Sequence, residues 1–152
     1  MTENQDNRGI KLTPHTHKAQ YYETDQMGIV HHSNYIRWFE EARVRLLDEI
    51  GFGYTRMESE GIISPVLSMS CEYKSMVKFG DCVYVLPKVE EFNGVKLKVS
   101  YKVIDVNTGE LRTTGASSHC FLDRDYKPVN LKKTNMPLYE AVKGCIGLEI
   151  EI

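Results

Sequence analysis

The sequence lacks several features that would place it in a specialised class of protein. Basic residues show no excess: 19 Lys and Arg stand against 21 Asp and Glu, for a formal net charge of -2. A dedicated nucleic-acid-binding protein usually carries a basic excess, so this class is disfavoured. No apolar run approaches the roughly 18 residues of a membrane span. Residues 1–8 are polar and acidic, unlike a secretory signal, so we expect neither a membrane span nor secretion.

Closely spaced cysteines are also missing. The chain has four cysteines and no Cys-x-x-Cys pair, which disfavours a zinc ribbon or a thioredoxin-type redox motif. Three of the four lie in apolar, strand-like runs, where a free cysteine behaves as a small buried hydrophobic residue. Reduced, structural thiols of this kind are typical of the cytoplasm, and we expect the protein there. The four are Cys71, Cys82, Cys120 and Cys145.

The length of 152 residues predicts one domain rather than two. Residues 1–14 are mostly polar and show no periodicity, so we expect a mobile tail that ends at Pro14. No repeat, low-complexity tract or linker follows. Residues 15–152 are therefore expected to form a single domain.

A long amphipathic helix dominates the first half of the chain. Apolar residues recur at spacings of three and four from Tyr35 to Ile50, which puts them on one broad stripe. Ser33 or Asn34 can cap the start of this helix, and Gly51 can end it. The helix is thus expected to have roughly 17 residues and to be about 25 Å long.

After Pro65 the apolar period changes to two, which is typical of strands with one solvated face. Asn93-Gly94 is the strongest hairpin signal, and its simplest register pairs Glu91 with Lys96. That register also sets Val89 against Lys98, and this mismatch predicts a β-bulge. The other expected elements are strands over residues 15–22, 67–73, 82–86, 95–103 and 111–123, a short helix over 54–60, and a C-terminal helix starting at Asn135 or Pro137.

The helix stripe and the apolar face of the sheet both need a cover. Wrapping an antiparallel sheet around the one long helix satisfies both requirements. The sequence therefore predicts an α+β fold with this arrangement.

The loop before the long helix is the strongest candidate for chemistry. Asp25 precedes Gly28, which can supply a tight bend, and the helix begins a few residues later. Backbone N–H groups at a helix start are unpaired and carry partial positive charge. They can bind an oxyanion or polarise a carbonyl that faces the carboxylate. An aspartate before a helix is more often a cap or turn residue, so this pattern alone leaves both interpretations open.

The segment Tyr22-x-x-Asp25-x-x-Gly28-x-Val30-x-His32-x-x-Tyr35, continuing to Glu41-Ala42-Arg43, resembles the signature of the 4-hydroxybenzoyl-CoA thioesterase family. The resemblance is closest to the bacterial Tol-Pal-associated acyl-CoA thioesterase branch. It implies the hotdog fold and hydrolysis of an acyl-CoA to a free acid and CoA. It places the nucleophile or general base on Asp25, the bend on Gly28 and the oxyanion-binding backbone N–H on His32. It further implies no metal or redox cofactor, and a homodimer or homotetramer.

Two histidines separate this chain from the aryl-specific members of that family. His31 stands where those enzymes have Trp, and His32 stands where they tend to have Tyr. The resemblance therefore favours short or medium aliphatic acyl-CoA substrates. Two other functions stay open: a non-catalytic module that binds acyl groups or CoA, and a hydratase or dehydratase with the same fold.

Other polar residues have structural interpretations. His15 and His17 would lie on one face of a strand and could form a metal-binding pair, but no third ligand is evident, so we expect a solvated strand edge. Glu41 and Arg43 are expected to form a solvated or interface ion pair. His119 is expected to be a hydrogen-bonded core or interface residue.

Coenzyme A carries several phosphates, so an acyl-CoA site needs basic side chains near its mouth. Spacing alone does not choose among the candidates. These are Arg112, Arg124, Lys127, Lys132 and Lys133.

Overall fold

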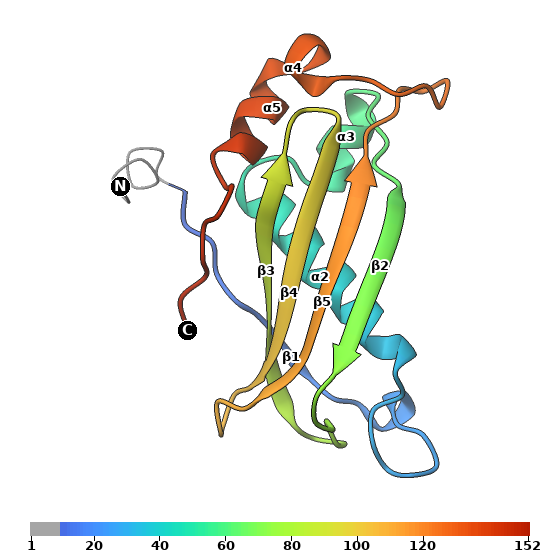
Figure 1. The fold of residues 1–152 in the computed structure, drawn as a ribbon, viewed down its shortest axis with the longest axis vertical. Helices are drawn as coiled ribbons and strands as arrows, with labels where there is room; N and C mark the ends of the chain where they lie inside the picture. Colours follow the sequence, from blue (N-terminus) through green and yellow to red (C-terminus); the bar gives the residue numbers. More distant parts are fainter. Residues whose placement is uncertain (1–9) are drawn as a thin grey trace.

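A five-stranded antiparallel sheet packs against one long helix (Figure 1). The computed structural model describes residues 10–152. The strands follow the order β1-β3-β4-β5-β2, and the long helix α2 lies across one face of the sheet. The strands are β1 (His15–Lys18), β2 (Val66–Tyr73), β3 (Cys82–Phe92), β4 (Lys96–Asp105) and β5 (Leu111–Cys120). The helices are η1 (Tyr21–Glu23), α2 (Ser33–Glu49), α3 (Tyr54–Ser59), α4 (Leu131–Thr134) and α5 (Met136–Lys143).

The N-terminal segment differs from its prediction in two ways. Residues 1–9 of the expected tail lie outside the described residues, but residues 10–14 contact the domain. Ile10 and Leu12 pack against the core, and the Thr13 amide donates to Glu49 Oε1 at 3.0 Å. The first strand ends at Lys18 rather than near residue 22, because the chain turns into the 3-10 helix η1.

Helix α2 has the 17 residues that the apolar spacing predicts. Its apolar stripe lies on the sheet, where Phe39 stacks on Tyr101 of β4 with ring centroids 4.5 Å apart. The same ring covers Gly115 of β5, where an added Cβ would come within 2.4 Å of Phe39 Cε2. Only glycine leaves room for this close approach. Gly51 follows the helix with φ +90, a conformation that glycine adopts without strain.

The hairpin between β3 and β4 turns next to Asn93-Gly94, but its register differs from the predicted one. The Asn93 amide donates to Lys96 O at 3.3 Å, so Gly94 and Val95 form the tip. The Asn93 side chain fixes this turn by accepting the amides of Val95 and Lys96 at 2.9 and 2.8 Å. The predicted bulge is confirmed. It lies between Val89 and Glu91, and the observed pairs on either side of it are Val89 with Val99 and Glu91 with Lys98.

Strand β2 forms one edge of the sheet and is less buried than its alternating pattern predicts. Val66, Leu67 and Tyr73 are 47%, 51% and 49% exposed. Only β5 pairs with β2 in the part of the chain that the structure describes. An apolar edge of this length is a template for pairing with another chain.

The C-terminal segment covers one end of the sheet (Figure 1). Helix α5 begins where predicted, and its cap Asn135 accepts the Leu138 amide at 3.1 Å. The short helix α4 before it was not predicted. None of the helices in residues 10–152 is long and apolar enough to cross a membrane.

A chain of polar groups runs through the core between α2 and the sheet. Arg43 Nη1 donates to the Tyr101 hydroxyl at 2.9 Å, this hydroxyl lies 2.7 Å from Ser117 Oγ, and Ser117 Oγ lies 2.7 Å from His119 Nε2. Arg43 is 6% exposed and His119 is 1% exposed. The expected solvated ion pair of Arg43 is therefore wrong, because the guanidinium is buried against a phenol. The expected core position of His119 is confirmed.

Burial, together with the nearby charge of Arg43, lowers the pKa of His119 from 6.5 to about 4. The unfolded chain binds a proton at this position near pH 6.5, whereas the folded chain binds it only near pH 4. The free energy of unfolding should therefore fall by about 1–3 kcal/mol as the pH drops through this window. His119→Gln, whose amide can still reach Ser117, should remove that part of the loss. Urea unfolding of the wild type and of His119→Gln at several pH values measures the free energy of unfolding. An equal decrease in both proteins would show that other groups cause the acid sensitivity.

Candidate active site

The loop of residues 24–30 holds Asp25 in a tight turn. Thr24 and Val30 form a short antiparallel bridge, and the Asp25 amide donates to Ile29 O at 2.8 Å. The Gly28 amide donates to Asp25 O at 3.0 Å, with Gly28 at φ +79, where glycine is unstrained. Asp25 Oδ1 accepts the Met27 amide at 2.8 Å. The carboxylate is thus oriented by its own turn, and the expected bend lies at Gly28.

Helix α2 begins at Ser33, with His32 as its N-cap. The sequence predicts a cap at Ser33 or Asn34, but the N-cap is His32, whose side chain makes no capping hydrogen bond, and His31 Nδ1 accepts the Ser33 amide at 3.2 Å. Within residues 10–152, the His32 amide N–H donates to no other group. Its carbonyl accepts the Tyr73 hydroxyl at 3.1 Å, and its ring stacks on His31 at 4.2 Å. The helix start therefore presents an unpaired donor where the helix dipole is positive.

Asp25 and His32 line the same cavity, which has a volume of about 270 Å³. Met27, Ile29 and Val30 supply apolar wall from the loop, and Tyr35 supplies it from α2. The opposite wall consists of Tyr73 at the end of β2 and the three residues that follow it, Lys74, Ser75 and Met76. An aspartate and a residue with an unpaired backbone amide thus line the same mostly apolar space.

The sequence did not predict that Tyr73 and the residues after β2 would form a wall of the cavity. Desolvation of the phenol and the neighbouring Cys71 thiol raise the pKa of Tyr73 to about 12, so the hydroxyl stays protonated and keeps donating to the His32 carbonyl. In the sequence, Tyr73 is only the last apolar residue of an alternating strand. Its place beside the helix start depends on how β2 packs across α2.

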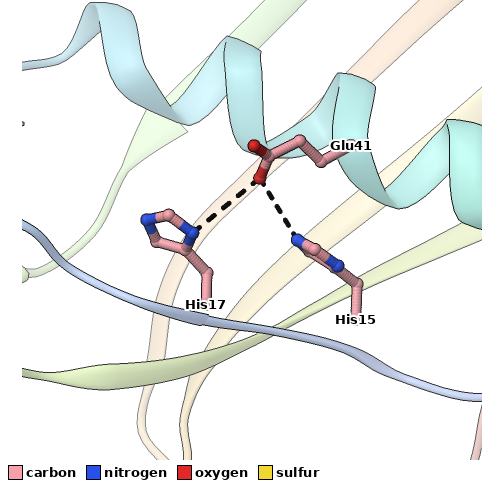
Figure 2. A group of neighbouring side chains, drawn as sticks. All are labelled: His15, His17 and Glu41. Carbon is pink, nitrogen blue, oxygen red and sulfur yellow. Dashed lines mark hydrogen bonds and ion pairs between the residues drawn. The ribbon is translucent and has the colours of Figure 1, made fainter.

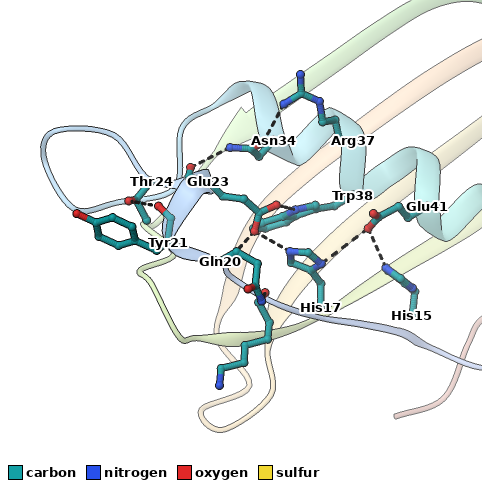
Figure 3. Close-up of polar contacts among 11 residues, drawn as sticks. His15, His17, Gln20, Tyr21, Glu23, Thr24, Asn34, Arg37, Trp38 and Glu41 are labelled. Carbon is teal, nitrogen blue, oxygen red and sulfur yellow. Dashed lines mark hydrogen bonds and ion pairs between the residues drawn. The ribbon is translucent and has the colours of Figure 1, made fainter.

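Glu23 anchors the Asp25 loop to the helix and to β1 (Figure 3). Its carboxylate accepts His17 Nε2, the Gln20 amide and Trp38 Nε1, each at 2.8 Å. Burial alone would raise the pKa of Glu23, but these hydrogen bonds outweigh it and lower the pKa below its usual value. The Glu23 carbonyl accepts the His31 amide and Asn34 Nδ2, both at 2.8 Å. Sequence reasoning did not single out this residue, because a glutamate near an aspartate carries no signal of burial.

The two histidines of β1 lie on one face of the strand, as predicted, and Glu41 of α2 joins them (Figure 2). His15 Nε2 lies 3.2 Å from Glu41 Oε1, and His17 Nδ1 lies 3.8 Å from the same oxygen. A third potential ligand is therefore present, contrary to the sequence interpretation. Glu41 also pairs with these histidines rather than with Arg43. Glu41 is distant in sequence, so only the packing of β1 on α2 reveals the group.

None of the five basic candidates for phosphate binding lines the cavity in the described residues. Arg112 is engaged by Asp105 at 3.0 Å and by Glu110 at 3.1 Å. Arg124 donates to the Ser59 carbonyl at 3.1 Å. The segment after β5 and helix α4, which carry the three lysines, lie at the opposite end of the sheet from the Asp25 loop (Figure 1). Lys74, which was not a candidate, is a basic residue that does line the cavity.

Comparisons with known proteins agree with this geometry. Residues 20–143 match the Thioesterase-like superfamily. The putative acyl-CoA thioesterase YneP of Bacillus subtilis is 38% identical over 117 residues, which cover 76% of this chain and 84% of that protein. The acyl-CoA thioester hydrolase YbgC of Escherichia coli is 22% identical over 117 residues, 77% of this chain and 87% of that protein.

A solved structure gives the same result. The DHNA-CoA thioesterase of Staphylococcus aureus superposes with a TM-score of 0.81 at 34% sequence identity, covering 86% of this chain and 88% of that chain. The match to the superfamily spans most of the chain, and the arrangement of sheet and helix is shared. The protein belongs to the Thioesterase-like superfamily, and the sequence-based prediction of a thioesterase with the hotdog fold is confirmed.

Proposed function

We propose that this protein hydrolyses acyl-CoA thioesters to a free acid and CoA in the cavity between Asp25 and the start of α2. The observation that carries the proposal is that Asp25 and His32, whose amide is unpaired among the described residues, line one small, mostly apolar cavity. The named relatives, including an acyl-CoA thioester hydrolase and a DHNA-CoA thioesterase, support the same reaction. In this proposal the thioester carbonyl lies between the two groups.

The His32 amide would stabilise the negative charge that develops on the carbonyl oxygen. Attack on a thioester gives a tetrahedral oxyanion, and removal of one donor to such an oxyanion typically costs about 10²–10³ in rate. The helix dipole adds to the favourable field at this point. In this proposal the Tyr73 hydroxyl acts as a positioning group, since it donates to the carbonyl of His32.

Asp25 can act by two routes. In the first, a carboxylate oxygen bonds to the thioester carbon, the C–S bond breaks, and the CoA thiolate leaves and takes a proton from water. A second water then cleaves the mixed anhydride. In the second route, Asp25 accepts a proton from a water whose oxygen bonds to the carbon. The C–S bond then breaks, and the leaving thiolate takes the proton.

The two alternative functions predict different products. A binding module would hold CoA thioesters and release no thiol. A hydratase would add water to crotonyl-CoA and leave the thioester bond intact. Measuring both free thiol and loss of the crotonyl double bond separates the three functions in one set of assays.

Asp25→Asn is the direct test of the catalytic role. The substitution keeps an oxygen that can accept the Met27 amide but removes the charge needed to attack carbon or take a proton. We expect kcat to fall by at least about 10²-fold, because general-base catalysis typically contributes 10²–10⁴. Steady-state release of free thiol measures the effect, and the melting temperature should stay nearly unchanged.

Asp125→Asn is the matched control, since Asp125 is an exposed aspartate in the turn after β5 and does not line the cavity. It should keep wild-type turnover. His32→Ala keeps the backbone donor and should lower kcat less than Asp25→Asn. Wild-type turnover in folded Asp25→Asn would remove Asp25 from the mechanism and favour the binding module.

The substrate preference is proposed from the two histidines and the cavity wall. Met27, Ile29 and Met76 give the wall flexible or branched aliphatic surface, which adapts to an alkyl chain. We expect a higher kcat/KM for short or medium aliphatic acyl-CoAs than for aryl-CoAs. The name of the Staphylococcus aureus relative favours a second candidate, an aryl-CoA such as 1,4-dihydroxy-2-naphthoyl-CoA. A panel with both kinds of thioester decides, and a higher kcat/KM for the aryl substrate would reverse the preference.

Assembly into at least a homodimer is proposed from the free edge of β2. A second copy would pair with the unpartnered backbone of this strand and cover Val66 and Leu67, which are about half exposed. Light scattering at micromolar concentration should give at least twice the chain mass of 17.5 kDa. Leu67→Glu should weaken the assembly, whereas Asn107→Glu in the β4–β5 turn should not. A fully active monomer would refute the proposal.

The branch of the superfamily to which the protein belongs and its cellular location are also proposals. The Tol-Pal-associated branch is favoured by the Asp25-to-Tyr35 motif, although YbgC relatives are only 22–26% identical. A cytoplasmic location is supported by Cys71, Cys82 and Cys120, which are free thiols.

A further inference from the structure

Two histidines of β1 and one glutamate of α2 converge outside the Asp25 cavity (Figure 2). The nitrogen and oxygen atoms that could bind an ion all lie within 4.8 Å of one another. We propose that His15, His17 and Glu41 bind a divalent transition-metal ion, for which Zn²⁺ is the best match. This site is independent of the thioesterase reaction, and nothing in the proposed mechanism uses it.

The hydrogen bonds of Glu23 orient the lone pair of His17 toward the cluster (Figure 3). The Trp38 indole and the Gln20 amide can only donate, and they occupy both oxygens of the Glu23 carboxylate. Nε2 of His17 lies 2.8 Å from the same carboxylate and is the natural third donor. With the proton on Nε2, the lone pair of His17 is on Nδ1, which faces Glu41 Oε1 at 3.8 Å. Two electron-pair donors that face each other in this way are stabilised either by a proton on Nδ1, which gives an ion pair, or by a metal ion bound between them.

A carboxylate that accepts the far N–H of a histidine is a common outer contact of metal-bound histidines. It fixes the tautomer and the ring orientation and makes the other nitrogen a better ligand. Glu23 is 5% exposed and is tied to the loop and the helix as well, so it holds the His17 ring firmly. The cluster thus has a supporting contact that a chance group of surface side chains would lack.

The distances are close to those of a tetrahedral site. Zinc bonds of about 2.0–2.1 Å place neighbouring ligand atoms roughly 3.3–3.4 Å apart. His15 Nε2 and Glu41 Oε1 are 3.2 Å apart, and His17 Nδ1 is 3.8 Å from the same oxygen. The side chain of Glu41 is 50% exposed, so it can rotate to close the remaining gap. All three ligand atoms lie within 4.8 Å of one another, so small side-chain rotations would bring them to one ion.

The surroundings leave a fourth position for solvent. His17, Glu23 and Glu41 all line a second cavity of about 550 Å³, separate from the one that contains Asp25. Two imidazoles and a carboxylate suit Zn²⁺, Ni²⁺ or Co²⁺, whereas Ca²⁺ and Mg²⁺ prefer all-oxygen sites. A bound ion would join the four-residue edge strand β1 to the middle of α2.

The test uses the full chain without a histidine tag, stripped of metal with a chelator and then freed of the chelator. Zn²⁺ alone is titrated by calorimetry, and Co²⁺ is titrated by its visible absorption bands, which report ligand geometry. We expect one ion per chain. Glu41→Gln and His15→Ala should each weaken Zn²⁺ binding by at least about tenfold and change the Co²⁺ bands.

Glu40→Gln is the matched control, because it removes the same charge from an exposed neighbouring position on α2. It should bind Zn²⁺ like the wild type. The variants avoid His17, whose loss would also remove a hydrogen bond from buried Glu23. The proposal is overturned if the wild type binds no stoichiometric Zn²⁺, which would leave a simple ion pair between the histidines and Glu41. Equal binding by Glu41→Gln and Glu40→Gln would overturn it as well.

Discussion

The buried carboxylate of Glu23 is the contact on which the arrangement of the site depends. It accepts hydrogen bonds from β1 through His17, from its own turn through Gln20, and from α2 through Trp38. A buried charge is costly unless its hydrogen bonds are made, and here three donors satisfy it. Because the backbone of the same residue holds the His31 amide, the Asp25 loop cannot move away from the helix start without breaking this network. Two distinct features, the candidate active site and the histidine cluster, share this support.

The sheet supplies the second constraint, since it sets what faces the start of α2. Gly115 lets Phe39 approach the sheet closely, so α2 packs tightly against β5 and β4. The end of β2 then comes beside His32, and the Tyr73 hydroxyl reaches the His32 carbonyl at 3.1 Å. A helix terminus normally needs capping groups or water for its free amides. At this terminus the Tyr73 hydroxyl holds the His32 carbonyl, His31 Nδ1 accepts the Ser33 amide, and the His32 amide has no acceptor among the described residues.

The polar groups in the core between α2 and the sheet cost stability but help to align the two layers. Arg43 is buried with the Tyr101 phenol as a partner rather than a carboxylate, and its Nε has no partner among the described residues. Such groups reduce the stability of a core, but the polar chain to Ser117 and His119 also defines how α2 aligns with β4 and β5. The low pKa of His119 is one consequence of placing a titratable ring beside this buried cation.

The local pattern of the sequence determined the long helix, the hairpin beside Asn93, the bulge and the Asp25 turn, because each depends on residues close together in the chain. The family signature added the fold. The sequence did not reveal Glu23 as an anchor, Tyr73 and Lys74 as cavity wall, or Glu41 beside two histidines. Each of these residues acts through a partner that is distant in the sequence. The contacts Glu23–Trp38, His15–Glu41 and His32–Tyr73 join residues that are 15 to 41 positions apart. Their contacts arise only when β1 and β2 pack against α2, so tertiary structure alone decided them.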